Sequence, residues 1–301
     1  GGLGDVAGAL PAALEQQGHF VTLVVPKYPS TVRSPHFSAD RLSKQPGRRD
    51  VVYHQLSNSP QRRTVFVEAG SLFERSGLYG ERGADYPDNA LRFATFSAAV
   101  IDFVELNRDF PPVDVVHAHD WQTGLIPARL RSDSQWPSLQ HAGVVLTIHN
   151  LAYQGLFPKE TVPAIGLPWS LFTMNSGEFW GKFSFLKAGL TSADFVTTVS
   201  PTYAEETKTK DAGAGLEGVL AGLGRRYVGI LNGIDTDTWN PATDPLLPAH
   251  FDSNDRTGKA ECKRTLLAHF GLPRGDDALE RPLIGMVSRL VAQKGLDLIE
   301  R

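Results

Sequence analysis

Histidine, asparagine and aspartate side chains follow directly after two apolar segments of this sequence. These polar residues are His117, His119, Asp120, His149 and Asn150. An unbroken apolar run is typical of a strand buried in a parallel sheet, and open α/β sheets bind ligands beyond the carboxyl ends of their strands. The sequence therefore predicts that His149 lies where a ligand would bind. The alternative is a histidine that only caps a strand end and hydrogen-bonds a nearby carbonyl.

The alternation of His117 and His119 also raises the question of a metal site. A buried zinc site needs three or four ligands, and no cysteine or histidine partner stands at a motif spacing from this pair. We therefore expect no metal ion, and the sequence indicates no other cofactor. Trp121 can stack on a sugar ring or pack in the core, and packing is the usual role of an isolated tryptophan.

Two cations and one amide stand in comparable positions later in the chain. These residues are Asn232, Arg289 and Lys294. Asn232 follows the apolar segment 227–231. Arg289 follows the apolar segment 282–287 and Lys294 precedes an expected helix, so both cations occupy positions that suit a bound phosphate. The alternative is that they are ordinary surface cations.

The first six residues, GGLGDV, combine glycines with an acid. The residues concerned are Gly1, Gly2, Gly4 and Asp5. We expect a tight turn into an amphipathic helix, where glycine lets backbone amides approach a ligand and the helix start attracts anions. The segment is not a P-loop, because no Gly-Lys-Ser/Thr follows, and it lacks the ribose-binding acid of a dinucleotide fingerprint. A plain strand-to-helix turn is the alternative.

The glycine- and tyrosine-rich segment 72–89 shows neither helical nor strand periodicity. Loops of this length are often lids or binding loops. Tyr86 and Asp88 stand directly before an expected helix, and Asp88 is a natural N-cap for it. Capping alone would explain the aspartate.

Expected strands alternate with expected helices along the chain. The strands are expected at 20–25, 51–56, 64–68, 113–116, 144–148, 195–199, 227–231 and 282–287, and the helices after 88 and at 182–190 and 259–270. This alternation predicts an α/β fold with doubly wound parallel sheets. The segment 236–257 is rich in aspartate, proline, asparagine and threonine, which indicates a boundary before a second α/β domain.

The composition excludes several classes of function. The 301 residues carry a formal net charge of -3 and no long basic run, so neither nucleic acid nor an anionic membrane is an expected partner. The longest largely apolar stretches, such as 93–101, are too short to cross a membrane. The single cysteine, Cys262, excludes an internal disulfide and fits a reducing compartment. We expect a soluble cytoplasmic protein whose sequence is cut at both ends.

A set of motifs resembles the bacterial glycogen synthases and plant starch synthases, which are retaining glucosyltransferases of the GT-B fold. In chain order the motifs are GGLGDV, YPDN, DVVHAHDWQTG, TIHNLAYQG, FSFLKAGL, TTVSPTYAEE, LNGIDTDTWNP and VSRLVAQKGLDL. The resemblance implies two Rossmann-like domains: residues 1–240 form the acceptor side and residues 241–301 begin the nucleotide-sugar-binding side. It also implies transfer of glucose from ADP-glucose to the nonreducing end of an α-1,4-glucan.

The resemblance also implies roles for single residues. His149, Arg289 and Lys294 match catalytic residues: the two cations match the pair that contacts the donor phosphates, and His149 matches the histidine beside the transferred glucose. The implied substrate-binding residues are Gly1, Gly2, Gly4, Asp5, Tyr86, Asp120 and Asn232. Gln122 is a local departure, since many members carry histidine there. The family's early lysine and its later glutamate and glycine-rich turn fall outside the sequence, so we expect this fragment alone to be inactive.

The family mechanism implies that the glucan 4-hydroxyl attacks on the same face that the leaving phosphate departs from. The sequence offers no obvious covalent nucleophile, and no carboxylate pair at glycosidase spacing can be identified, which argues against hydrolysis. Two alternatives stay open at this point. One is another GT-B sugar transferase, and the other is a noncatalytic glucan- or nucleotide-binding protein of this fold.

Overall fold

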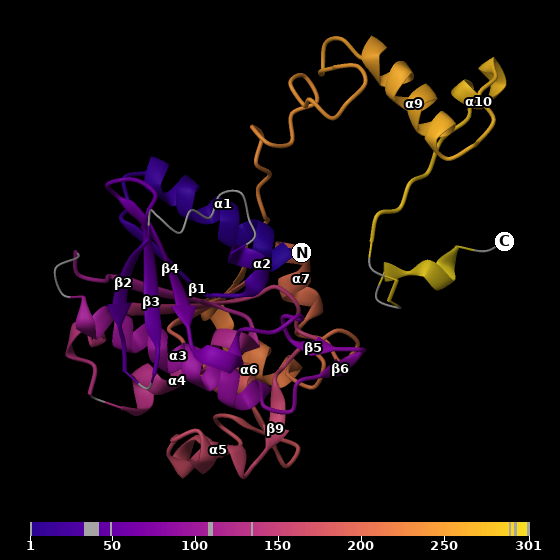
Figure 1. Ribbon diagram of the computed structural model, residues 1–301. Coiled ribbons are helices and arrows are strands. Elements are labelled where there is room, and N and C mark those ends of the chain that lie inside the picture. Colours follow the sequence, from indigo (N-terminus) through magenta and orange to yellow (C-terminus); the bar gives the residue numbers. More distant parts are fainter. Residues whose placement is uncertain are drawn as a thin grey trace. The chain divides into compact units, whose positions relative to one another are not determined.

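The computed structural model describes residues 2–32, 42–48, 50–107, 111–133, 135–288, 290–291 and 294–299 (Figure 1). The helices are α1 (Gly2–Gln16), α2 (Pro29–Val32), α3 (Asn89–Leu106), α4 (Leu125–Ser132), α5 (Thr161–Ala164), α6 (Phe185–Ser192), α7 (Pro201–Glu206), α8 (Glu217–Gly222), α9 (Thr257–His269) and α10 (Asp276–Glu280). The strands are β1 (Val21–Pro26), β2 (Ser43–Pro46), β3 (Val52–Ser57), β4 (Arg62–Glu68), β5 (Gly80–Glu81), β6 (Ala84–Asp85), β7 (Val115–His119), β8 (Gly143–Ile148), β9 (Leu156–Pro158), β10 (Glu178–Phe179), β11 (Lys182–Ser184), β12 (Phe195–Thr198) and β13 (Tyr227–Gly229). Contacts divide the chain into two compact units, Gly1–Asn232 and Gly233–Arg301.

One sheet of the first unit is mixed. Its strand order is β1-β4-β3-β2, in which β4 runs parallel to β1 and antiparallel to β3. The strands expected at 51–56 and 64–68 are confirmed by β3 and β4, which pair with each other. Tyr53 of β3 is fully buried, and its hydroxyl donates to the carbonyl of Ala99 at 2.8 Å, which ties this sheet to α3.

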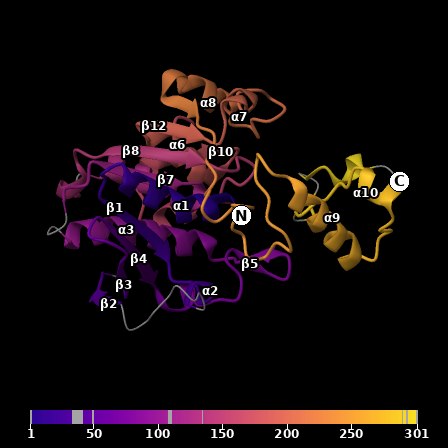
Figure 2. The ribbon, with the colours of Figure 1, turned by 90° about the horizontal axis from the view of Figure 1, so that it is seen from above.

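The second large sheet is parallel throughout, in the order β13-β12-β8-β7. Figure 2 shows β12, β8 and β7 one after another in this sheet. Val144, Leu146 and Ile148 lie on one face of β8 and are all 0% exposed, and Thr147 on the other face is 9% exposed. This burial explains the unbroken apolar run in the sequence. The expected α/β class with a parallel sheet is confirmed.

Helix α3 supplies much of the core. Its sequence is rich in alanine and has no glycine or proline, and the aromatic rings of Phe93, Phe96 and Phe103 are almost fully buried. Burial of each such ring stabilises the fold by roughly 1.5 to 3 kcal/mol. Leu91 of the same helix is 48% exposed, whereas Ala94 is 3% exposed. Among the described residues, no helix is both long enough and apolar enough to cross a membrane.

The chain makes a long excursion between β8 and α6. It forms a small antiparallel sheet, in the order β10-β11-β9, together with α5. Figure 1 shows β9 and α5 at the bottom of the view. The helix expected at 182–190 is therefore only partly correct, because residues 182–184 form β11. Phe183 pairs with Phe157 of β9, and the hydroxyl of Ser184 accepts the N–H of Lys187 at 3.1 Å. This N-cap fixes the start of α6 at Phe185.

The second unit contains α9, which confirms the helix expected at 259–270, and α10. The strand expected at 282–287 is not formed: these residues are irregular, and Ile284 and Val287 are 92% and 105% exposed. A parallel strand needs hydrogen-bonded neighbours, and no strand is described within this unit. Residues 282–287 therefore have the apolar sequence of a buried strand, but no neighbouring strand is described in this unit to hydrogen-bond with them.

This difference between the units predicts the outcome of limited proteolysis on the 301-residue chain. Cleavage should occur between Thr236 and Pro282, because this segment exposes large side chains such as Trp239 and Leu246, at 74% and 89%. The resistant product should begin near the amino terminus and end near residue 240. Mass spectrometry of the fragments would identify both ends. Survival of the carboxyl-terminal segment with digestion of the first unit would contradict this division of the chain.

Candidate active site

The carboxyl ends of β7 and β8 bring the predicted polar residues together. In the register of these parallel strands His119 pairs with Thr147, so β7 ends directly before Asp120 and β8 ends directly before His149 at the same edge of the sheet. Strand β12 continues this edge, where the hydroxyl of Thr198 donates to the carbonyl of Ile148 at 2.9 Å. This pairing brings Asp120 next to His149. His117 and His119 were expected after the first strand, but they lie within β7.

Asp120 links the ends of the two strands. Its carboxylate Oδ1 accepts the backbone N–H of His149 at 2.7 Å and that of Asn150 at 3.4 Å, and its own N–H donates to the carbonyl of Thr147 at 2.9 Å. The backbone of Asp120 has φ 55° and ψ −172°, a region that is strained for any residue except glycine. Such strain costs about 1 to 3 kcal/mol and is concentrated at functional sites, so the surrounding hydrogen bonds hold this carboxylate in place.

Burial raises the pKa of Asp120 to about 6, although the two backbone N–H groups that it accepts act in the opposite direction. Desolvation therefore outweighs hydrogen bonding at this carboxyl. A pKa near neutrality is typical of groups in reactive clefts, but it is also found at structural positions. Asp120 can exchange a proton near physiological pH while it keeps the end of β8 in position.

Three histidine rings lie in a row beside this carboxylate. Nε2 of His149 lies 3.1 Å from Nδ1 of His119, whose ring lies 4.2 Å from the ring of His117. Nε2 of His117 is hydrogen-bonded to the hydroxyl of Thr147 at 2.6 Å, and that hydroxyl lies 2.6 Å from the hydroxyl of Thr197. These contacts of rings and hydroxyls therefore connect β7, β8 and β12.

The imidazoles of this row are neutral at physiological pH. Burial lowers the pKa of His149 to about 4, with a further contribution from His117, and it lowers the pKa of His119 to about 3. Neutral rings can donate and accept hydrogen bonds to sugar hydroxyls without adding charge to the site. Within the part of the chain that the structure describes, no three histidine, cysteine, aspartate or glutamate side chains are grouped to hold a metal ion.

Tyr86 lies in the loop before α3 and is held by its neighbours. The guanidinium carbons of Arg75 and Arg92 lie 4.7 and 4.9 Å from the centre of its ring, and its hydroxyl accepts the N–H of Gly77 at 3.2 Å. Asp88 stands at the N-cap position of α3, but its side chain makes no capping hydrogen bond. It instead binds Arg75 in a bidentate ion pair at 2.6 and 2.7 Å, so the expected capping role is wrong.

Arg92 is a buried side chain that hydrogen-bonds the backbone of the loop that carries Tyr86. It is 0% exposed, and it donates to the carbonyls of Leu72 and Leu78 at 2.6 and 3.0 Å and to Oδ1 of Asn89 at 2.7 Å. The sequence pattern gave no sign of this role, because an arginine on a helix usually faces solvent. The contacts of Tyr86 are structural ones, and its contact with a substrate stays a prediction.

The glycine-rich start of the chain differs from the expected turn. Gly2, Gly4 and Asp5 are exposed and already lie within α1, and a Cβ added to either glycine would meet no neighbouring atom within 4 Å. The helix that was expected to begin after these residues already includes them, although glycine within a helix costs roughly 0.5 to 1 kcal/mol relative to alanine. Gly1 lies outside the described residues. Contact of this segment with a ligand stays a prediction.

The remaining predicted residues are not joined to His149 by any described contact. Asn232 is exposed and ends the first unit, three residues after β13. Lys294 is exposed in the second unit, and its backbone N–H donates to the carbonyl of Val291 at 2.9 Å. Arg289 lies outside the described residues. The phosphate-binding role of the two cations therefore stays a prediction.

Trp121 packs in the core, as expected for an isolated tryptophan. It is 8% exposed, and its ring lies 4.9 Å from the ring of Phe93. Gly155 lies against its indole with φ 61°, and a Cβ there would come within 2.4 Å of the ring. This close approach requires glycine in the TIHNLAYQG motif, and it holds the loop after His149 against the core.

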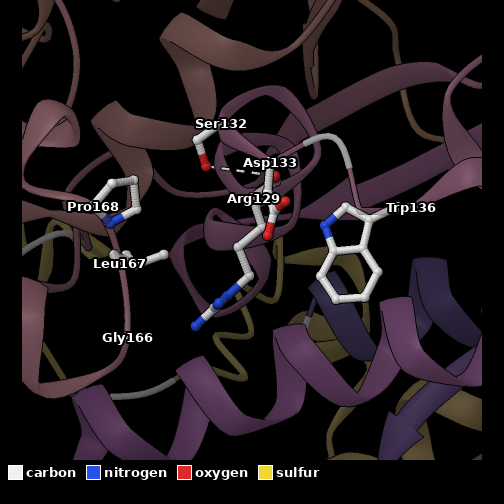
Figure 3. Close-up of a pocket in the computed structure, with 7 residues that line it drawn as sticks. All are labelled: Arg129, Ser132, Asp133, Trp136, Gly166, Leu167 and Pro168. Carbon is white, nitrogen blue, oxygen red and sulfur yellow. Dashed lines mark hydrogen bonds between the residues drawn. The ribbon is translucent and has the colours of Figure 1, made fainter.

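A cavity of about 400 Å³ lies elsewhere in the first unit, between the end of α4 and the loop after α5 (Figure 3). It is lined by Arg129, Ser132, Asp133, Trp136, Gly166, Leu167 and Pro168. The guanidinium of Arg129 donates to the carbonyl of Ile165 at 2.9 Å, which fastens this loop to α4. None of the residues singled out by the motifs lines the cavity, so it is separate from the candidate site.

Comparisons with known proteins agree with the motifs. Residues 1–222 match the family model described as the starch synthase catalytic domain. Glycogen synthases of Myxococcus xanthus and Anaeromyxobacter dehalogenans are 46% and 47% identical to this chain over 99% of its length. These alignments cover 63% and 62% of the relatives, so the chain spans less than two thirds of their length.

A solved structure is similar over the same extent. It is the catalytic domain of starch synthase IV from Arabidopsis thaliana bound to ADP and acarbose, which is 33% identical with a TM-score of 0.82. The similarity covers 99% of this chain and 61% of that one, and it confirms the GT-B fold class. The family model matches residues 1–222, and the glycogen synthases are 46% and 47% identical over nearly the whole chain. The chain therefore belongs to the glycogen and starch synthase family that is defined by the starch synthase catalytic domain.

Proposed function

We propose that the protein is a cytoplasmic glycogen or starch synthase that transfers glucose from ADP-glucose to the nonreducing end of an α-1,4-glucan, with retention of configuration. The observation that carries this proposal is the site at the ends of β7 and β8, where Asp120 fixes the backbone of His149 in a chain of this family. The starch synthase IV structure, which is bound to ADP and acarbose, supports a nucleoside diphosphate donor and a glucan-like acceptor.

The proposed catalytic residues are His149, Arg289 and Lys294. The two cations would contact the donor phosphates and stabilise the nucleoside diphosphate as it leaves, since fixed positive charge aimed at a developing anion lowers the barrier to reaction. The residues proposed to line the substrate are Gly1, Gly2, Gly4, Asp5, Tyr86, Asp120 and Asn232. We assign residues 1–240 to the acceptor side and residues 241–301 to the start of the nucleotide side.

The low pKa of His149 suits this reaction. Breakage of the bond to the leaving phosphate creates positive charge at the anomeric carbon of glucose, and an imidazolium nearby would repel it. Because burial keeps His149 neutral, its ring adds no positive charge that would repel this carbon. The same-face attack of the glucan hydroxyl, assisted by the departing phosphate, then needs no covalent nucleophile from the protein.

A donor and chelation assay tests the proposed reaction. Full-length protein incubated with glycogen and ADP-glucose should extend the glucan, and excess EDTA should leave the rate unchanged, because Arg289 and Lys294 serve the phosphates. UDP-glucose at the same concentration should be a poorer donor. Product length and anomeric configuration can be followed by chromatography and NMR. Loss of activity on chelation, or preference for UDP-glucose, would refute the corresponding part of the proposal.

A further inference from the structure

His119, at the last position of β7, has no part in the proposed reaction so far. Its Nδ1 lies 3.1 Å from Nε2 of His149, and the two rings are tilted by 35° with their centres 5.3 Å apart. Two imidazole nitrogens at this distance form a hydrogen bond only when one proton lies between them. One ring must therefore donate and the other must accept.

The surroundings of His149 select the direction of this hydrogen bond. Nδ1 of His149 is buried and has no hydrogen-bond partner among the described residues. A buried N–H without an acceptor is rarer in proteins than an under-used acceptor, so the proton is better placed on Nε2. On Nε2 it meets the lone pair of Nδ1 of His119. Because both pKa values are low, each ring carries a single proton at neutral pH.

We propose that His119 is a positioning residue that accepts the Nε2–H of His149 and thereby fixes the tautomer and the orientation of that ring. The ring of His117, 4.2 Å away and hydrogen-bonded to Thr147, supports the ring of His119 in turn. The expected effect of His119 on the rate of glucose transfer rests on the proposed function, whereas the expected tautomer of His149 does not. A purely space-filling role for His119 predicts neither a fixed tautomer nor a need for a hydrogen-bond acceptor.

Nitrogen NMR tests the tautomer without any assay of activity. In full-length protein labelled with 15N in histidine, His149 should show a protonated Nε2 and an unprotonated Nδ1, and these signals should vanish in His149→Ala. The His119→Phe variant keeps a flat ring but has no lone pair, so the His149 signals should shift toward a mixture of tautomers. A proton on Nδ1 in the unmodified protein, or an unchanged His149 spectrum in His119→Phe, would overturn the proposal.

Kinetics test the catalytic consequence. His119→Phe should lower kcat about tenfold or more with little change in KM, since small errors in the placement of a catalytic group have large effects on rate. His119→Asn, whose Oδ1 can accept the same proton, should recover most of that loss. His54, a buried histidine on β3, offers a matched control, and kcat of His54→Asn should stay close to that of the unmodified protein.

The outcomes separate the two proposals. Equal losses of kcat in His119→Phe and His119→Asn, at unchanged Tm, would show that acceptance of the proton is unimportant and would reject the positioning role. If the unmodified protein transfers no glucose to glycogen, the proposed function fails, and the NMR experiment alone still decides whether His119 fixes the tautomer of His149. Tm values of all variants establish that each one is folded.

Discussion

Replacement of His149 by alanine is expected to lower the turnover of the full-length protein about a hundredfold, while Tm changes little. The side chain lies at the end of β8, outside the apolar core, and its only described side-chain hydrogen bond is the one to His119. Loss of a transition-state contact of this kind costs roughly 3 kcal/mol of activation free energy, which corresponds to that change in rate. Steady-state kinetics with ADP-glucose and glycogen, together with calorimetry, would measure both quantities.

The chain provides a matched control for this variant. His141 is an exposed histidine that precedes β8, so it lies near the opposite end of the same strand. His141→Ala should leave both kcat and Tm close to those of the unmodified protein. If Tm of His149→Ala falls together with its activity, the catalytic prediction is contradicted and His149 is a structural cap at the end of the strand.

Acid is expected to destabilise the first unit through the buried histidines. The folded-state pKa values of His149 and His119, about 4 and about 3, lie below the ordinary value of 6.5, so the unfolded chain binds more protons at mildly acidic pH. Their contribution to the free energy of unfolding is therefore complete above pH 6.5 and falls progressively toward pH 4 and below. The pKa of Asp120 is shifted upward, so its contribution has the opposite sign and offsets part of this loss.

A comparison of variants isolates the histidine contribution. Between pH 7 and pH 5, Tm of the unmodified protein should fall by about 4 °C more than Tm of His149→Gln, which cannot take up a proton at this position. His141→Gln, which replaces an exposed histidine before β8, serves as the control variant. Parallel Tm curves for all three proteins across this range would show that burial of His149 has no effect on acid stability.

The strand-end site could be predicted because its signal is local. The apolar run of β8 stops at Ile148, and the polar His149 and Asn150 follow directly after it in the sequence. The same reasoning identified Asp120 after β7. In each case a single buried strand accounts for the apolar run and for the place of the polar residue that follows it, so no knowledge of distant contacts is needed.

Other features depend on pairing between distant segments and could not be predicted in this way. The contact of His119 with His149 depends on the register of β7 against β8, which the spacing within either strand does not specify. The segment 182–184 is a strand only because Phe183 finds Phe157. The apolar segment 282–287 has the pattern of a strand and is not one, since no described partner strand pairs with it.

The buried guanidinium of Arg92 has a consequence for the thermodynamics of ligand binding. Its hydrogen bonds to the carbonyls of Leu72 and Leu78 already fix the backbone of the loop that carries Tyr86. A flexible loop would lose about 1 to 2 kcal/mol of conformational entropy per residue on closing around a ligand, and this loop has lost much of it during folding. Under the proposed function, a glucan that bound against Tyr86 would meet a preorganised surface, and ordering of this loop would add little to the entropy lost on association.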